Sequence, residues 1–105
     1  MANEYNSSEG GFIDYEEASQ LHGNYISSSC YANNNNIKAH FFGKDKLATL
    51  LQKPGAVGVR MYYGKKSSGD PVLLIVAVDS DGNEMRDQIL DYSLPCPHHC
   101  SAVPF

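Results

Sequence analysis

The chain has little of what several large protein classes require. Only 8 of its 105 residues are Lys or Arg, and its formal net charge is −4, whereas binding to nucleic acid needs a clustered basic face that neutralises phosphates. No apolar run approaches the roughly 20 residues that span a bilayer, and the N-terminus shows no signal peptide. We therefore expect a soluble protein that binds neither nucleic acid nor membranes. A cytoplasmic location follows, unless a leader has been removed or export is unconventional.

Cysteine is also scarce, and its count of three is odd, so a secreted scaffold built on disulfides is not expected. The sequence contains no nucleophile elbow, phosphate-binding glycine loop or helical metalloprotease motif. Nucleophilic catalysis would need Cys30 or Cys96 to meet a histidine and a carboxylate, for example His40 and Asp70. Nothing in the local sequence favours that arrangement. We predict that the protein is not an enzyme.

A chain of this length is expected to form a single core. Hydrophobic residues make up 42% of the sequence, but they are rare at its N-terminal end. Composition therefore divides the chain into three segments. Residues 1–11 are expected to form a flexible arm, residues 12–92 a single domain, and residues 93–105 a tail rich in Cys, Pro and His.

Two helices are predicted. Asp14 is suited to cap a helix that begins near Tyr15, because a carboxylate at this position accepts backbone N–H groups of the first turn. Apolar residues at three- and four-residue spacing extend this helix to about Ser29. A leucine stripe predicts a second helix at about Lys44 to Gln52, which Pro54-Gly55 ends.

The strands come from the second half of the chain. Residues 57–63 alternate between apolar and other side chains, and residues 72–78 are continuously apolar. Residues 79–83 predict a tight turn, so that residues 83–90 return as a third strand or a short helix. Residues 37–42 are left open between a strand and the start of a helix. The fold class expected is α+β, with two helices packed on a small antiparallel sheet of about three strands.

The most apolar strand is the basis for an expectation of self-association. Both faces of residues 72–78 must be covered, and a sheet this narrow needs either a helix or another subunit to cover its second face. Arg60, Tyr62 and Tyr63 are candidate interface residues, because Tyr and Arg are common where interfaces are strongest. The expected core consists of Phe41, Phe42, Leu50, Leu51, Leu73, Ile75 and Val76.

The tail holds the residues most suited to chemistry. Zinc could be held by two thiolates and two imidazoles, and the candidate ligands are Cys96, Cys100, His98 and His99. Four ligands within five consecutive residues would strain a tetrahedral site. One ligand would therefore have to come from Cys30, His22 or His40. Alternatively, Cys96 and Cys100 form a disulfide across a five-residue loop. An unpaired tail stiffened by proline is the third alternative, and the spacing leaves all three open.

Several segments carry a resemblance to a known family. They are residues 38–44, 54–64, 76–79 and 95–97. Together they resemble a family of small, uncharacterised bacterial proteins with a Cys-Pro-rich C-terminal tail, and the resemblance covers about residues 37–100. It implies a soluble bacterial protein and no particular activity.

The leading functional hypothesis is a non-enzymatic structural or interaction protein. It would self-associate through its sheet, with the arm and the tail contacting neighbours, to give a closed homo-oligomer or a filament. The alternative is a small metal- or ligand-binding module that uses the C-terminal Cys and His residues, with zinc as its cofactor; otherwise we expect no cofactor. A redox or hydrolytic enzyme is the third hypothesis.

Overall fold

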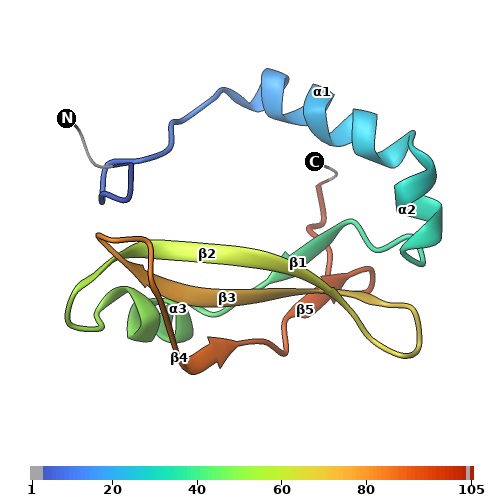
Figure 1. The fold of residues 1–105 in the computed structure, drawn as a ribbon. Coiled ribbons are helices and arrows are strands. Elements are labelled where there is room, and N and C mark those ends of the chain that lie inside the picture. Colours follow the sequence, from blue (N-terminus) through green and yellow to red (C-terminus); the bar gives the residue numbers. More distant parts are fainter. Residues whose placement is uncertain (1–3, 104) are drawn as a thin grey trace.

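The structure is a computed structural model that describes residues 4–103 and 105. Residues 1–3 of the predicted arm lie outside this range. The described part contains three helices and two antiparallel sheets, which confirms the α+β class (Figure 1). The elements are α1 (Tyr15–Ile26), α2 (Ser29–Asn33), β1 (Ala39–Phe41), α3 (Lys44–Leu51), β2 (Ala56–Lys65), β3 (Pro71–Asp79), β4 (Glu84–Leu90) and β5 (Leu94–Cys96).

The larger sheet has the strand order β2-β3-β4. β3 lies in the centre, which is why its sequence is apolar on both faces. The turn between β3 and β4 forms as predicted. The Asp79 carboxylate accepts the N–H groups of Asp81 and Asn83 at 2.9 Å, and Gly82 has a φ of +85° that favours glycine. Residues 84–90, left open between strand and helix, are the strand β4.

The core lies between α3 and one face of this sheet. Leu50, Ile75 and Ala77 are buried at its centre. The expected core residues Phe41 and Leu51 are instead 61% and 53% exposed. Neighbouring residues of a strand point to opposite faces, and neighbouring residues of a helix lie about 100° apart. One member of each adjacent pair therefore faces the core, and the other faces away.

A second sheet joins the two ends of the domain. β1 and β5 pair antiparallel, with Ala39 opposite Cys96 and Phe41 opposite Leu94. This resolves residues 37–42, which contain β1 rather than the start of a helix. Ile37 and Cys96 are buried here, at 8% and 6% exposed. The predicted tail therefore begins inside the fold.

The N-terminal helix begins where the sequence predicts. Asp14 caps α1, because its Oδ1 accepts the N–H of Glu17 at 2.8 Å. The helix ends at Ile26 rather than near Ser29, and α2 follows it. The Ser28 hydroxyl donates to the Tyr25 carbonyl at 2.6 Å. Consecutive serines compete in this way for backbone groups, which explains the early end.

The expectation that both predicted helices pack on the sheet is wrong. Only α3 lies on the three-stranded sheet, whereas α1 stands away from it and contacts α2 (Figure 1). No residue of α1 is buried. Its apolar face is interrupted by Gly23 and Asn24 and is too weak to hold it on the sheet.

Candidate interaction surface

The two edges of the three-stranded sheet are differently protected. β2 pairs with β3 in unbroken register from Gly58 to Lys65, and on its other side the described part of the chain provides no further strand. The exposed half of this edge carries Met61, Tyr62 and Tyr63, which are 53%, 44% and 93% exposed. A long strand edge with exposed apolar side chains is a template for pairing with another chain.

The opposite edge is built against such pairing. β4 presents the exposed Arg86 and Asp87, and its register with β3 shifts between Val76 and Ala77. Charged side chains and irregular registers are two of the ways in which proteins prevent edge-to-edge association. The free edge of β2 is therefore the better candidate for an interface.

The three interface candidates lie on this edge but do not form one patch. Arg60 and Tyr62 point to the same face of β2, and Tyr63 points to the other face because side chains alternate along a strand. On the first face, the register brings Gly58, Val78 and Glu84 side by side. Glu84 thereby comes within reach of both Arg60 and Tyr62.

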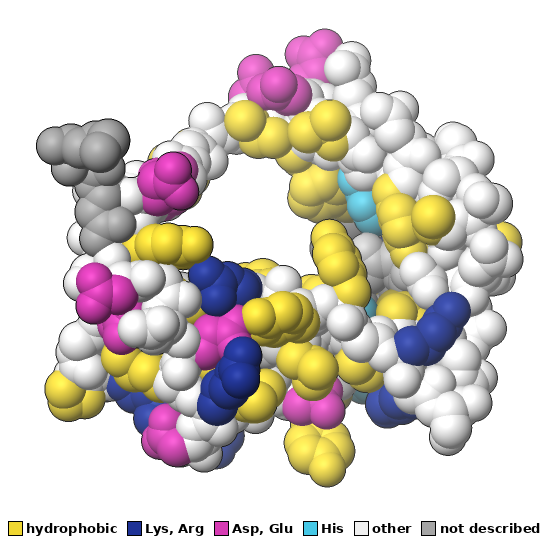
Figure 2. All heavy atoms as spheres, in the orientation of Figure 1, with side chains coloured by type: hydrophobic (Ala, Val, Ile, Leu, Met, Phe, Trp, Pro, Cys, Tyr) yellow, Lys and Arg dark blue, Asp and Glu magenta, His cyan; other side chains and the backbone are white. Residues whose placement is uncertain are grey.

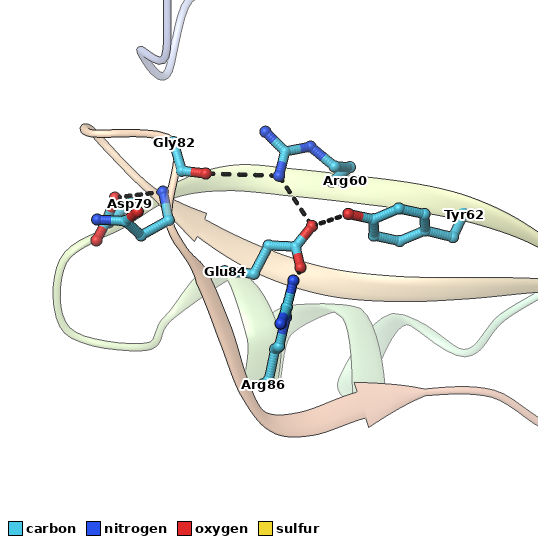
Figure 3. A network of polar contacts seen from close by, with 7 residues as sticks. Arg60, Tyr62, Asp79, Gly82, Glu84 and Arg86 are labelled. Atoms are coloured by element: carbon cyan, nitrogen blue, oxygen red, sulfur yellow. Dashed lines mark hydrogen bonds and ion pairs between the residues drawn. The ribbon is translucent and has the colours of Figure 1, made fainter.

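Glu84 is the centre of a polar network on this face (Figure 3). Its Oε2 accepts a hydrogen bond from the Tyr62 hydroxyl and one from Arg60 Nη1 at 2.9 Å. Its Oε1 accepts from Arg86 Nε at 2.8 Å. These bonds, that of Tyr62 first, lower the pKa of Glu84 to about 2. Arg60 is thus paired within the molecule, and because Glu84 also pairs with Arg86 the network keeps one net positive charge.

The N-terminal segment passes over the sheet and leaves open space beneath it. Figure 2 shows an opening through the molecule between this segment and the sheet. Within this segment Phe12 is fully exposed, and Ile13 is 53% exposed. The segment touches the sheet again at Tyr5, whose ring centroid lies 5.6 Å from the Arg60 guanidinium carbon. Such a ring over a guanidinium is a cation–π contact.

In the tail, a disulfide joins Cys96 to Cys100, so neither sulfur is available as a thiolate in this state. His98 and His99 are exposed. The described residues contain no group of three or more His, Cys, Asp or Glu side chains arranged to hold a metal ion. Of the extra ligands considered for zinc, Cys30 is an exposed free thiol of α2, whereas His22 lines a pocket together with the disulfide and His99.

This tail pocket has a volume of about 330 Å³ and is lined both by α1, through His22, and by the C-terminal residues. The ring of Phe105 lies 5.4 Å from the rings of both Tyr15 and His22, edge to face. Lys38 lines the same pocket. Contact with the C-terminal residues is therefore part of what holds α1 in place.

His40 is half-buried, as expected of a core histidine. Its Nδ1 lies 2.8 Å from the Ser93 hydroxyl. Burial lowers the pKa of His40, and the nearby Asp91 carboxylate opposes this shift. The imidazole therefore bridges the start of β5 to β1 and serves the fold.

Comparison of the chain with protein-family models, curated proteins and solved structures finds no match. The resemblance to a bacterial family therefore stays a prediction. Among residues 4–103 and 105, no helix is long and apolar enough to cross a membrane.

Sequence reasoning missed the partners of the candidate residues. Glu84 and Tyr5 complete the contacts of Arg60, yet neither is close to it in sequence. An arginine in a strand whose other charge, Lys65, lies at its end was the one available signal, because a half-buried guanidinium is stabilised by a carboxylate elsewhere in the sheet. Only the register of β2, β3 and β4 identifies which one.

Proposed function

We propose that the protein is a non-enzymatic structural or interaction subunit that self-associates through the free edge of β2. The observation that supports this is the nature of that edge. Its regular register runs over eight residues, and its exposed half is mainly apolar. Its central charge, on Arg60, is already paired with Glu84. A strand edge of this kind exposes backbone donors and acceptors that a second copy can satisfy.

Two copies would pair β2 antiparallel about a two-fold axis. Such pairing keeps equivalent residues on equivalent faces, so both α3 helices would cover the same face of a continuous six-stranded sheet. A register with Arg60 opposite Arg60 of the second copy is disfavoured by like charge. Centring the axis within Met61–Tyr63 avoids this and buries the most exposed residues of the strand.

A pair joined only at β2 is a closed dimer, because an isologous contact uses the same surface of both copies. A filament needs a second, different contact. The N-terminal segment and the tail are the candidates for it, since both lie outside the three-stranded sheet (Figure 1).

Lysines on the β2 edge test the proposal. Replacing Met61 and Tyr63 by Lys puts two charges on exposed positions of β2, where the monomer should tolerate them. Gln88→Lys on the exposed part of β4 is the matched control. Sedimentation velocity over a range of protein concentrations should show a dimer or larger species for the wild type and the control, and a monomer for the double variant. Association that survives the β2 lysines with unchanged affinity would contradict the proposal.

The tail pocket favours a second candidate function, a small metal- or ligand-binding module. His22, His99 and both cysteines of the disulfide line one pocket, so reduction would place two thiols near two imidazoles. Calorimetric titration of the reduced protein with zinc tests this function. Binding that is lost in His22→Ala but kept in His98→Ala, the exposed neighbour, would support it. Equal binding by both variants, or none by the reduced wild type, would count against it.

A further inference from the structure

The N-terminal segment has a specific seat on the sheet, formed by Arg60 and Gly82. Besides lying over Arg60, the Tyr5 ring lies directly against Gly82. A Cβ atom built at Gly82 would come within 2.6 Å of a ring carbon, closer than real Cβ contacts. Glycine therefore suits position 82 in two ways, because it adopts the φ of the turn and because a Cβ there would displace this ring. The arm, residues 4–10, is held by a matched aromatic contact and not by chance proximity.

The arm is nevertheless poorly fitted to its own seat. A cavity of about 490 Å³ separates the remainder of the arm from Leu51, Val57, Val59 and Val78 on the sheet. Leu51 stays 53% exposed in this arrangement. Apart from Tyr5, residues 4–10 are polar or glycine and have little apolar surface with which to cover this floor, so the position of the segment is set by the constraint on the chain that follows it.

That constraint is the connection from the arm to α1. Gly10 and Gly11 have open space around them, and Gly10 has a φ of +106°. Phe12 follows, with its side chain fully in solvent. The chain runs along the opening seen in Figure 2 to reach α1, and Phe105 of the tail contacts α1 at His22. The glycine pair therefore has the conformational freedom that a hinge requires, and just beyond it Phe12 is fully exposed and Ile13 is 53% exposed.

We infer that the arm is exchanged between copies, with residues 4–10 of one molecule occupying the Arg60–Gly82 seat of another. The inference rests on the proposed self-association and adds a second contact to it. Exchange keeps the Tyr5 contacts, since the same side chains meet from a different chain. It removes the constraint set by the arm's own α1, so that the arm can approach its seat without spanning that opening. Only the hinge at Gly10-Gly11 must change conformation.

A photochemical cross-link tests the exchange directly. Tyr5 is replaced by the photoreactive analogue p-benzoylphenylalanine, and the irradiated protein is analysed by denaturing electrophoresis and peptide mass spectrometry. Sedimentation velocity of the same sample reports association independently. We expect products of twice the chain mass, with residue 5 of one chain joined to the 79–83 turn of another. Arg60→Met, which removes the cation under the ring, should reduce this product severalfold.

The outcomes separate the two proposals. Cross-links within one chain, in a sample that sediments as a dimer, would overturn the exchange and leave the β2 interface standing. Cross-links within one chain in a monomeric sample would overturn both. Absence of any cross-link to the 79–83 turn would show that the seat does not hold residue 5, and this also overturns the inference.

If p-benzoylphenylalanine does not fit the seat, mixing two variants that each lack one side of the contact tests the exchange instead. Tyr5→Ala has an intact seat but no ring to donate, whereas Gly82→Ala has the ring but a seat blocked by its Cβ. Each variant alone should dissociate at about tenfold higher concentration than the wild type. In an equimolar mixture the Gly82→Ala arm can enter the Tyr5→Ala seat, so mixed dimers should form more tightly than either parent. A mixture no tighter than its components would refute exchange, and Arg60→Met replaces Gly82→Ala if the strained turn does not fold.

Discussion

Replacing Cys100 by Ser removes the cross-link at the C-terminal end of β5 while leaving Cys96 in place. The disulfide closes a loop of five residues. Chain-entropy arithmetic for a loop of this length gives a loss of about 2 kcal/mol in the free energy of unfolding at 25 °C. The native state should lose little else. Cys96 is 6% exposed, and as a free thiol it remains a small apolar side chain in the same place.

The strand around Cys96 should survive the substitution. The Cys96 carbonyl accepts the Lys38 N–H at 2.8 Å, and the residue pairs with Ala39 across the β1–β5 sheet. Neither contact involves Cys100. The loss should therefore appear as a lower free energy of unfolding of an unchanged fold.

Urea unfolding followed by circular dichroism measures the effect at one fixed protein concentration, since association also alters apparent stability. With a slope of about 1–3 kcal/mol per molar urea, the midpoint should fall by about 1 M. Reduced wild type and Cys100→Ser should coincide, and reductant should not affect the variant. Cys30→Ser, which removes the exposed free thiol, is the control and should unfold like the wild type. A Cys100→Ser midpoint equal to that of the oxidised wild type would refute the reasoning.

Three further changes test the core, the polar network and the helix cap. Ile75→Ala empties a site that is 1% exposed and should cost about 2–5 kcal/mol in urea unfolding, whereas Ile89→Ala, at 53% exposed, should cost little. The pKa of Glu84 is lowered to about 2, below that of a Glu in the unfolded chain, so ionised Glu84 stabilises the fold at neutral pH and this stabilisation is lost as pH falls from about 4.5 toward 2. Glu84→Gln should therefore make the melting temperature less dependent on pH over that range. A pH dependence equal to that of the wild type would argue against the network. Asp14→Ala removes the cap of α1 and should cost about 1 kcal/mol of helix stability. Because no residue of α1 is buried, that loss should appear as faster amide exchange in α1 with unchanged exchange in β3.

Features that depend on local sequence could be predicted. Asp14 caps a helix because its side chain meets backbone groups three residues away, and the Asp79 turn closes within five residues. The alternation in β2 and the continuous apolar run of β3 likewise predict how many faces of each strand are buried. In each case the residues that decide the structure lie next to one another in the chain.

What could not be predicted depends on contacts between distant residues. The β1–β5 sheet joins strands more than fifty positions apart, from Ala39 to Cys96, and three-residue strands carry too little pattern to be read alone. The seat of Tyr5 combines Arg60 with Gly82, which no spacing rule connects. The position of α1, which stands away from the three-stranded sheet, was also unpredictable, because a weak apolar face does not indicate the surface on which a helix packs.

The pairing of β1 with β5 has a consequence for engineering the chain. The first and last strands of the domain lie side by side, so its two ends leave from one place on the surface. A short linker there could connect residue 38 to residue 97, and new termini could be opened in the exposed loop at residues 66–68. Such a circular permutant should keep the β2-β3-β4 sheet with the order of the chain rearranged. It would carry neither the arm, α1 nor α2, and would show which properties of the chain belong to the two sheets and α3 alone.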